Sequence, residues 1–380
     1  MVWTERLLIP GPTHVPSEVL GAQARQMTNH RGASFSELVG AVEEEIALLA
    51  DAERAVVLPS SGTGGLEAVA QNLLRPGDRV LAVSGGAFGE RFARVAERSG
   101  AEVTRLEVTW GEAASPAEVV ARAASGDFRA VLLTQNETST GVLHPVEEIA
   151  WRLAGGPLVI VDAISGFPAV PLKLRKAGID AAVACSQKGF MAPPGLSLVL
   201  LGPRGLDAAS APADRPAYFD LRPYLKGSLP YTPAVSLVYA LRESLRLLEE
   251  EGEEARLGRH RLLAAMTRSA GKALGLAPLA PAAVASPAVT ALEVPGGQAD
   301  ALRRAAQRRG AVLAGGQDRL KGRIVRVGHV GSVMPVDLLG GLGALELARA
   351  EVLGSAPDGR GVAAALGVWA VSWTTERSGA

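Results

Sequence analysis

The sequence predicts an α/β protein in which a mostly parallel sheet is flanked by helices and followed by a smaller C-terminal α+β domain. Two observations carry this prediction: short apolar runs alternate with amphipathic stretches over the first two thirds of the 380 residues, and the pattern changes near Gly252. Alternating strands and helices are typical of parallel sheets that are covered on both faces. We therefore expect a large domain over residues 1–251 and a small domain over residues 252–380.

The elements of the large domain are expected at short intervals along the chain. Apolar runs predict strands at residues 79–83, 101–106, 130–134, 158–162 and 198–201. Helical spacing of apolar residues predicts helices at residues 88–98, 119–124, 146–153 and 236–251. Sheets of this kind bind their ligands at the carboxyl ends of the strands, so functional residues are expected directly after the apolar runs.

The small domain is expected to have a different order of elements. Its predicted helices cover residues 255–274 and 299–309, and its predicted strands cover residues 288–294, 311–313 and 324–328. Residues 362–373 are apolar but fewer than the roughly 18 residues that span a bilayer. We expect this segment to form a packed terminal helix or a sticky tail.

The composition excludes several classes of protein. Hydrophobic residues make up 48% of the chain and charged residues 21%, which favours a large core over disorder. The formal net charge is zero, so we expect neither a nucleic-acid surface nor an electrostatic membrane anchor. Cys185 is the only cysteine, and the first ten residues lack the basic and apolar regions of a signal peptide. A cytoplasmic protein without a metal site is the default expectation.

Lys188 is the most informative residue of the chain. It is one of six lysines, and it alone directly follows an apolar strand-like run, while Asp162 ends another such run upstream. A lysine and an aspartate at the ends of two buried strands are what pyridoxal 5′-phosphate (PLP) needs. The lysine forms a Schiff base with the cofactor, which desolvation favours by lowering the pKa of the amine, and the carboxylate keeps the pyridine nitrogen protonated. A lysine at a strand end is otherwise ordinarily just solvated.

A glycine-rich turn indicates where a phosphate group would bind. Ser61, Gly62 and Thr63 precede a stretch whose apolar residues recur with helical spacing, namely Leu66, Val69, Ala70, Leu73 and Leu74. Free N–H groups and the helix dipole favour an anion at the start of a helix. The alternative is a capped helix after a tight turn. Together with Lys188, this turn is expected to hold the PLP phosphate.

Four further residues have both a functional and a plain structural interpretation. Thr138 follows a predicted strand and could reach the O3′ atom of PLP or form a local turn. Phe88 could stack on the pyridine ring or belong to the core, and Thr232 could reach a phosphate or lie in a loop turn. Arg326 lies in a predicted strand and offers the planar donor that carboxylates prefer, although a strand arginine is usually solvated or paired.

These residues carry a resemblance to a known family. The chain resembles the class V, fold-type I PLP-dependent aminotransferases, and among them the alanine–glyoxylate and serine–glyoxylate (serine–pyruvate) aminotransferases. The matching segments run in family order over residues 7–350 and are Pro10-Gly11-Pro12-Thr13, His30-Arg31, Ser61-Gly62-Thr63-Gly64, Glu137-Thr138-Ser139-Thr140-Gly141-Val142, Val161-Asp162, Ser186-Gln187-Lys188-Gly189, Pro193-Pro194-Gly195, Tyr231-Thr232-Pro233-Ala234-Val235 and Arg326-Val327-Gly328.

The resemblance implies a role for each of these site residues. Lys188 and Asp162 would be catalytic, and the cofactor would also contact Ser61, Gly62, Thr63, Phe88, Thr138, Gln187 and, from the partner subunit of a homodimer, Thr232. Arg326 and Gly11 would bind the substrate. Leu229 stands where some relatives have a tyrosine that contacts the cofactor or the substrate, so we do not expect that contact in this chain.

The implied activity is ping-pong transamination from a small amino acid, alanine or serine, to a 2-oxo acid such as glyoxylate or pyruvate. Other PLP chemistry on the same fold is an alternative, including aspartate transamination, a lyase or decarboxylase, and cysteine desulfuration. Desulfuration needs a nucleophilic cysteine on a mobile loop, whereas Cys185 lies in the apolar run before Lys188. A non-catalytic subunit with the same fold is the remaining alternative. The sequence does not fix the donor or the acceptor.

Overall fold

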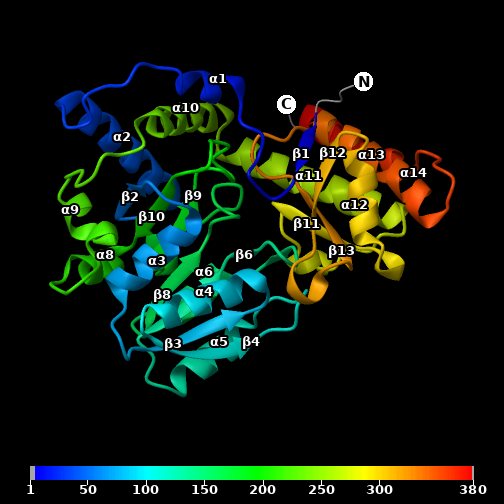
Figure 1. Cartoon of the computed structure of the whole chain (residues 1–380). Helices are drawn as coiled ribbons and strands as arrows, with labels where there is room; N and C mark the ends of the chain where they lie inside the picture. Colours follow the sequence, from blue (N-terminus) through cyan, green and yellow to red (C-terminus); the bar gives the residue numbers. More distant parts are fainter. Residues whose placement is uncertain (1–4, 379–380) are drawn as a thin grey trace.

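The computed structural model describes residues 5–378; residues 1–4 and 379–380, at the outer ends of the two predicted domains, lie outside the described residues. Its largest element is a seven-stranded sheet with the order β2-β10-β9-β8-β5-β3-β4 (Figure 1). The strands are β2 (Arg54–Leu58), β3 (Arg79–Ser84), β4 (Glu102–Glu107), β5 (Ala130–Thr134), β8 (Leu158–Asp162), β9 (Ala181–Cys185) and β10 (Ser197–Leu201). Strand β10 runs antiparallel to both of its neighbours, and the pairings from β9 to β4 are parallel. The predicted α/β fold with a mostly parallel sheet is confirmed.

Helices cover both faces of this sheet because successive strand residues point to opposite sides. Val131 and Leu133 of β5 join one apolar cluster, with residues of α2, α5, α6 and α10, whereas Leu132 joins another, with residues of α3 and α4. The helices of this region are α1 (Ser17–Ala22), α2 (Ala33–Ala50), α3 (Gly62–Leu73), α4 (Ala87–Arg98), α5 (Pro116–Ala124), α6 (Val146–Arg152), α7 (Leu174–Ala177), α8 (Pro203–Ser210), α9 (Leu221–Leu225) and α10 (Val235–Glu251). A two-stranded sheet of β6 (Asn136–Glu137) and β7 (Val142–Leu143) lies between β5 and α6 in the chain.

A four-stranded sheet with the order β1-β12-β13-β11 forms the second region. Its strands are β1 (Arg6–Leu8), β11 (Val289–Glu293), β12 (Ala311–Gly315) and β13 (Ile324–Gly328), and its helices are α11 (Glu253–Ala273), α12 (Ala299–Gln307), α13 (Pro335–Leu353) and α14 (Arg360–Ser378). Strand β1 pairs in parallel with β12, which the sequence patterns did not indicate. The N-terminal segment therefore starts in the smaller sheet although residues 1–251 were assigned to the large domain. The division into two domains near Gly252 stays a prediction.

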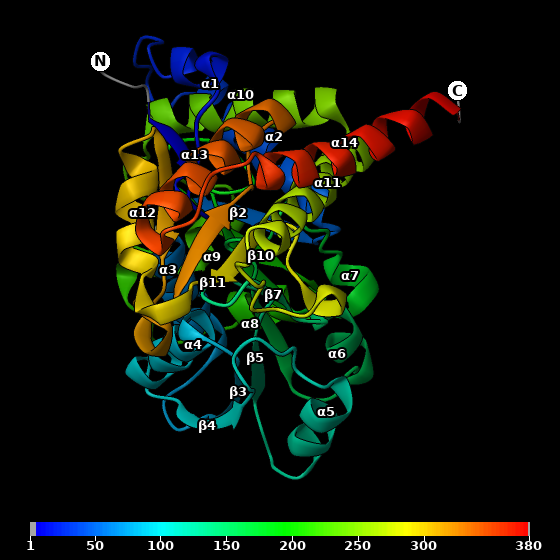
Figure 2. The same ribbon diagram turned by 90° about the vertical axis from the view of Figure 1, so that its right-hand side faces the viewer.

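The apolar segment near the chain end lies in α14. This helix packs against α11 and α13, and Ala365 is fully buried in the core of the smaller sheet's region. Figure 2 shows the C-terminal end of α14 extending away from α11, and Val371 there is exposed. Among the residues that the structure describes, no helix combines the length and the apolar character that crossing a bilayer requires.

Candidate active site

The carboxyl ends of the parallel strands surround one cavity of about 160 Å³. Asp162 is the last residue of β8, Lys188 follows β9, and Phe88 lies in the first turn of α4 after β3. Eight of the nine residues predicted to contact the cofactor line this cavity, namely Ser61, Gly62, Thr63, Phe88, Thr138, Asp162, Gln187 and Lys188. The structure thus brings together residues that are separated by more than a hundred positions in the chain.

The phosphate-binding turn predicted before α3 forms one wall of the cavity. The Ser61 hydroxyl accepts a hydrogen bond from the Gly64 N–H at 3.3 Å, so Ser61 caps the helix. A Cβ atom on Gly62 would lie 2.7 Å from the Ile164 side chain, which explains why a glycine stands there. The first N–H groups of α3 therefore approach the cavity closely, at the end of the helix that favours an anion.

Lys188 lies beneath the N-terminal segment of the chain. Its Nζ atom donates a hydrogen bond to the Pro10 carbonyl oxygen at 2.5 Å. Gly11 has a φ of +121°, and a Cβ atom there would lie 2.4 Å from Cδ of the Lys188 side chain. The Thr13 N–H in turn donates to the Gln187 carbonyl oxygen at 3.2 Å. The segment after β1 thus passes directly over the lysine, and Gly11 lies against the Lys188 side chain, while its role in substrate binding stays a prediction.

Thr138 lies in a hydrogen-bonded cluster at the second wall of the cavity. Its hydroxyl donates to the Ser165 hydroxyl at 2.6 Å, and the Asn136 side-chain amide donates to the same oxygen at 2.8 Å. The Asn136 side-chain oxygen is buried without a hydrogen-bond partner. The Ser165 hydroxyl thus holds Thr138 and Asn136 together in this wall.

Arg326 belongs to β13 of the smaller sheet and reaches across to the larger region. Its Nε atom donates to the Gly315 carbonyl oxygen at 2.8 Å, and Nη1 donates to the Thr138 carbonyl oxygen at 3.0 Å. Burial lowers the pKa of Arg326 to about 10, so the guanidinium is charged at neutral pH. Arg326 is not among the residues that line the cavity, and its contact with the site is through the Thr138 backbone.

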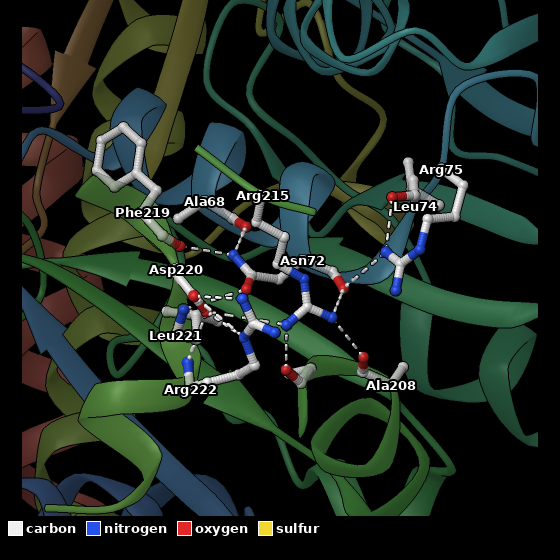
Figure 3. A network of polar contacts seen from close by, with 11 residues as sticks. Ala68, Asn72, Leu74, Arg75, Ala208, Arg215, Phe219, Asp220, Leu221 and Arg222 are labelled. Carbon is white, nitrogen blue, oxygen red and sulfur yellow. Dashed lines mark hydrogen bonds and ion pairs between the residues drawn. The ribbon is translucent and has the colours of Figure 1, made fainter. Parts of the chain in front are cut away.

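Thr232 is the one predicted cofactor residue that the fold places elsewhere. It is exposed in the loop before α10, next to Tyr231, whose ring stacks on Tyr218 with the ring centres 5.1 Å apart. Asn72 of α3 anchors the segment that carries Tyr218, because its side chain bonds both the Phe219 carbonyl oxygen and the Leu221 N–H (Figure 3). Arg215 strengthens this anchor by donating to the Asn72 carbonyl oxygen at 3.1 Å (Figure 3). The loop is therefore tied to the far end of the helix that begins at the phosphate-binding turn.

The family is decided by comparison with known proteins. The model of the family described as Aminotransferase class-V matches residues 9–329. The chain belongs to the class V aminotransferases. It is therefore an enzyme that transfers amino groups with the help of PLP, and the resemblance seen in the sequence is confirmed.

Several known proteins resemble this chain over nearly its whole length. It is 38% identical to the soluble hydrogenase small subunit of a Synechococcus species, with 94% of this chain and 97% of that protein covered. It is 35% identical to serine–glyoxylate aminotransferase of Methylorubrum extorquens, with 94% of each covered. The crystal structure of ureidoglycine–glyoxylate aminotransferase from Bacillus subtilis matches with a TM-score of 0.92 at 29% identity, covering 97% of this chain and 99% of that chain. Within residues 5–378, no group of three or more His, Cys, Asp or Glu side chains is placed to hold a metal ion.

The charges in the cavity of this aminotransferase suit PLP. Burial lowers the pKa of Lys188, with Arg326 and Arg91 acting in the same direction, and thereby favours the neutral amine. Burial raises the pKa of Asp162 to about 7, the Glu137 carboxylate acts in the same direction, and the hydrogen bond from the Ile164 N–H at 2.9 Å opposes both effects. A protonated pyridine nitrogen would give this carboxylate the positive partner that it lacks. The residues present therefore fit the cofactor at both ends of the ring.

Sequence reasoning missed several residues of the cavity. Arg91, Asn136, Ile164 and Ser165 line it together with the predicted residues. Arg91 holds its guanidinium 4.6 Å from the centre of the Phe88 ring. The spacing of three residues from Phe88 on one helix could have indicated Arg91, because such residues share a helix face. Nothing in the local pattern singles out Ser165, whose position depends on the turn after β8.

Proposed function

We propose that this aminotransferase moves the amino group of alanine or serine to a 2-oxo acid such as glyoxylate or pyruvate by a ping-pong mechanism. The observation that carries the proposal is the single cavity in which Lys188, Asp162 and the turn before α3 meet, with Arg326 contacting its wall. The serine–glyoxylate aminotransferases of Methylorubrum extorquens and Arabidopsis thaliana, 35% and 32% identical, support a small amino acid as donor and glyoxylate as acceptor.

The proposed cofactor contacts follow from the positions of the cavity residues. The phosphate would bind at Ser61, Gly62, Thr63 and Gln187, Phe88 would stack on the ring, and Thr138 would lie near O3′. Bound PLP supplies the electron sink that acidifies the α-proton of the substrate amino acid. Asp162 would strengthen that property by keeping the pyridine nitrogen protonated.

The two remaining roles concern the proton and the substrate carboxylate. Lys188 would hold the cofactor covalently until the substrate amine replaces it. The released lysine, as a neutral amine, would then accept the α-proton of the substrate and donate it at C4′ of the cofactor. Its lowered pKa supports this use because only the unprotonated amine can accept a proton. Arg326 would grip the α-carboxylate of donor and acceptor alike, since both use the same site.

A panel of half-reactions tests the proposed activity. The purified holoenzyme is mixed with alanine, serine, glycine or aspartate, and the change in cofactor absorbance is followed before glyoxylate, pyruvate or 2-oxoglutarate is added. We expect fast conversion with alanine or serine and fast reversal with glyoxylate or pyruvate. Conversion with aspartate alone, or release of carbon dioxide or sulfide instead of a 2-oxo acid, would contradict the proposal.

We also propose that the enzyme is a cytoplasmic homodimer in which Thr232 of one chain completes the phosphate site of the other. The exposure of Thr232 and of the Tyr218 ring, together with the anchoring of their segment to α3, supports this arrangement. A hydroxyl that is turned to solvent in its own chain is free to meet the phosphate of a second chain.

A hybrid dimer tests the exchange of Thr232. One chain carries Lys188→Ala and the other Thr232→Glu, whose carboxylate repels a phosphate, and the two are co-purified through different tags. If Thr232 acts across the interface, one site of the hybrid is intact and about half of the wild-type activity returns. If Thr232 acts within its own chain, both sites are damaged and the hybrid stays as inactive as its parents.

A further inference from the structure

Glu137 carries a carboxylate that is completely buried and that the sequence patterns left without a role. It follows β5 and lies in β6, directly before Thr138. Its Oε2 atom accepts hydrogen bonds from the Phe88 N–H at 3.1 Å and the Gly89 N–H at 3.0 Å. Its Oε1 atom accepts from the Ser139 N–H at 3.0 Å and from the Ser139 hydroxyl at 2.5 Å.

These contacts identify Glu137 as an ionised carboxylate. All four partners are hydrogen-bond donors, and two of them are free N–H groups in the first turn of α4, where the helix dipole favours a negative charge. Burial raises the pKa of Glu137, and the hydrogen bonds from Ser139, Gly89 and Phe88 oppose that effect. The close contacts of the carboxylate are to these local donors, and Arg326 interacts with it electrostatically as well, because Glu137 raises the pKa of Arg326 against the effect of burial.

The carboxylate joins three parts of the cavity that face different groups of a bound molecule. Through the Phe88 N–H it fixes the start of α4 and hence the ring of Phe88. Through Ser139 it fixes the loop that presents the Thr138 hydroxyl to the cavity. The Thr138 carbonyl oxygen in turn accepts the hydrogen bond from Arg326, the residue of the smaller sheet.

A neighbouring glycine leaves room for this carboxylate. A Cβ atom on Gly86 would lie 2.3 Å from Cδ of Glu137 and 2.5 Å from the Ser139 hydroxyl. Gly86 has a φ of 173°, an extended conformation that any residue adopts. The requirement for glycine at this position is therefore one of space and not of backbone conformation.

We propose that Glu137 is a positioning residue: one buried carboxylate that fixes the Phe88 ring and the Thr138 loop against the cofactor and, through Thr138, steadies Arg326. The proposal rests on the proposed function, because Phe88, Thr138 and Arg326 have their roles from it. Glu137 itself touches neither cofactor nor substrate, so its effect must appear in how the cofactor is held and oriented.

Glu137→Gln tests the proposal with a side chain of the same size. The amide nitrogen of glutamine cannot accept a hydrogen bond, so it faces donors at Phe88 and Gly89 or at Ser139. We expect the dissociation constant of PLP to rise by about 10-fold or more, as for lost hydrogen bonds to a charged group. We also expect the visible circular dichroism of the bound cofactor to change, since that signal depends on the orientation of its ring relative to the protein.

Two further variants make the test specific. Gly86→Ala should displace the carboxylate without altering its charge, and it should weaken PLP binding and change the visible dichroism in the same direction. Glu43→Gln is the matched control: Glu43 is also buried and accepts the Val57 N–H at 3.0 Å, but it lies outside the cavity. This control is expected to bind PLP with the wild-type dissociation constant and to give the wild-type dichroism.

The outcomes separate this inference from the function on which it rests. If Glu137→Gln and Gly86→Ala bind PLP with unchanged affinity and unchanged visible dichroism, Glu137 is not a positioning residue, whatever their turnover. If Glu137→Gln does not fold, Ser139→Ala decides, because it removes one donor to the carboxylate: weaker PLP binding supports the inference and unchanged binding overturns it. A failure of the proposed function would appear elsewhere, as covalent attachment of the cofactor to a lysine other than Lys188.

Discussion

The two sheets contribute to the site in different ways. The seven-stranded sheet places its residues at strand ends: Asp162 closes β8 and Lys188 follows β9, where the carboxyl ends of parallel strands meet. The four-stranded sheet contributes Arg326 from the middle of β13, and its side chain reaches across to the Thr138 loop. The larger sheet thus provides a cavity by its topology, whereas the smaller sheet adds one long side chain and one backbone segment to it.

The two regions also differ in the charge of the groups that they contribute. The groups of the larger sheet have pKa values that burial shifts toward neutrality, as at Asp162 and Lys188. Such groups suit the exchange of protons. The arginine of the smaller sheet keeps its charge, which suits the binding of a carboxylate. Variants in the two regions should therefore fail in different steps.

Lys188→Ala should have the largest effect of these variants. It tests what the larger sheet contributes to the site. We expect loss of the covalently attached cofactor and a fall in turnover of at least about 100-fold, because the base and the attachment point disappear together. Reduction with borohydride followed by peptide mapping should find the cofactor on Lys188 in the wild type. The exposed Lys176→Ala is the control and should behave as wild type. Mapping of the reduced cofactor to another lysine would contradict the assignment of Lys188 as the residue that binds PLP covalently.

Arg326→Ala should break the contribution of the smaller sheet alone. Truncation of a buried charged partner typically costs about 2–5 kcal/mol of binding, so kcat/KM of both half-reactions should fall by roughly 30-fold or more. PLP binding should survive, and Arg326→Lys should recover little, because lysine cannot make the two-pronged contact. Arg323→Ala, an exposed arginine just before β13, is the control. Loss of the cofactor in Arg326→Ala would mean that Arg326 helps to hold PLP, which contradicts its assignment to the substrate carboxylate.

Gly11→Ala should disturb the contact between the N-terminal segment and Lys188, where the two regions meet. The new Cβ atom would meet the Lys188 side chain at 2.4 Å, and alanine is strained at a φ of +121°. We expect kcat to fall by about 10-fold, corresponding to strain of roughly 1–3 kcal/mol, with a smaller covalently bound fraction of PLP. Gly21→Ala, where nothing lies within 4 Å, should change neither quantity. A fully active Gly11→Ala enzyme would mean that the N-terminal segment lies farther from the lysine during turnover.

Acid should destabilise both regions through buried histidines, which are His144 in the larger region, where burial lowers the pKa to about 4, and two histidines in the smaller region. Burial lowers the pKa of His260 and His329, both in the smaller region, from 6.5 to about 3. As the pH falls below 6.5, these histidines take up protons in the unfolded chain, whereas in the folded chain they stay neutral until about pH 3. Stability is therefore complete above pH 6.5 and falls toward pH 3, by about 1.4 kcal/mol per pH unit for each histidine. Denaturant unfolding at pH 7, 6 and 5 should show this slope, and His329→Gln should reduce it. An unchanged slope in that variant would exclude His329 as a source.

The sequence predicted the larger region better than the smaller one. Strands such as β5 and β8 are short apolar runs with both faces buried, so their positions could be predicted from local composition alone. Strand β1 has three residues and pairs with β12 at the other end of the chain, and no local pattern indicates such a partner. The reversed direction of β10 could not be predicted from its composition either, because Ser197–Leu201 is about as apolar as the parallel strands β5 and β8.

The same distinction holds for the candidate site. The positions of Lys188 and Asp162 followed from a rule about strand ends, and the cavity does contain both. Arg326 could be singled out only through the resemblance, since a strand arginine by itself has many other uses. Glu137 escaped attention because its partners are N–H groups at the start of α4, which approach it only in the folded chain, whereas the spacing of Arg91 from Phe88 on one helix was a local signal that could have been used.

The pairing of β1 with β12 has a consequence for the order in which the protein forms during synthesis. Strand β1 leaves the ribosome before the other described elements, but its partner is made about 300 residues later, so the segment with Gly11 must wait unpaired until then. The seven-stranded sheet, whose strands all precede α10, can assemble in the meantime. The cover over Lys188 can therefore form only after β12 has been made, and a shorter chain leaves Lys188 open to solvent.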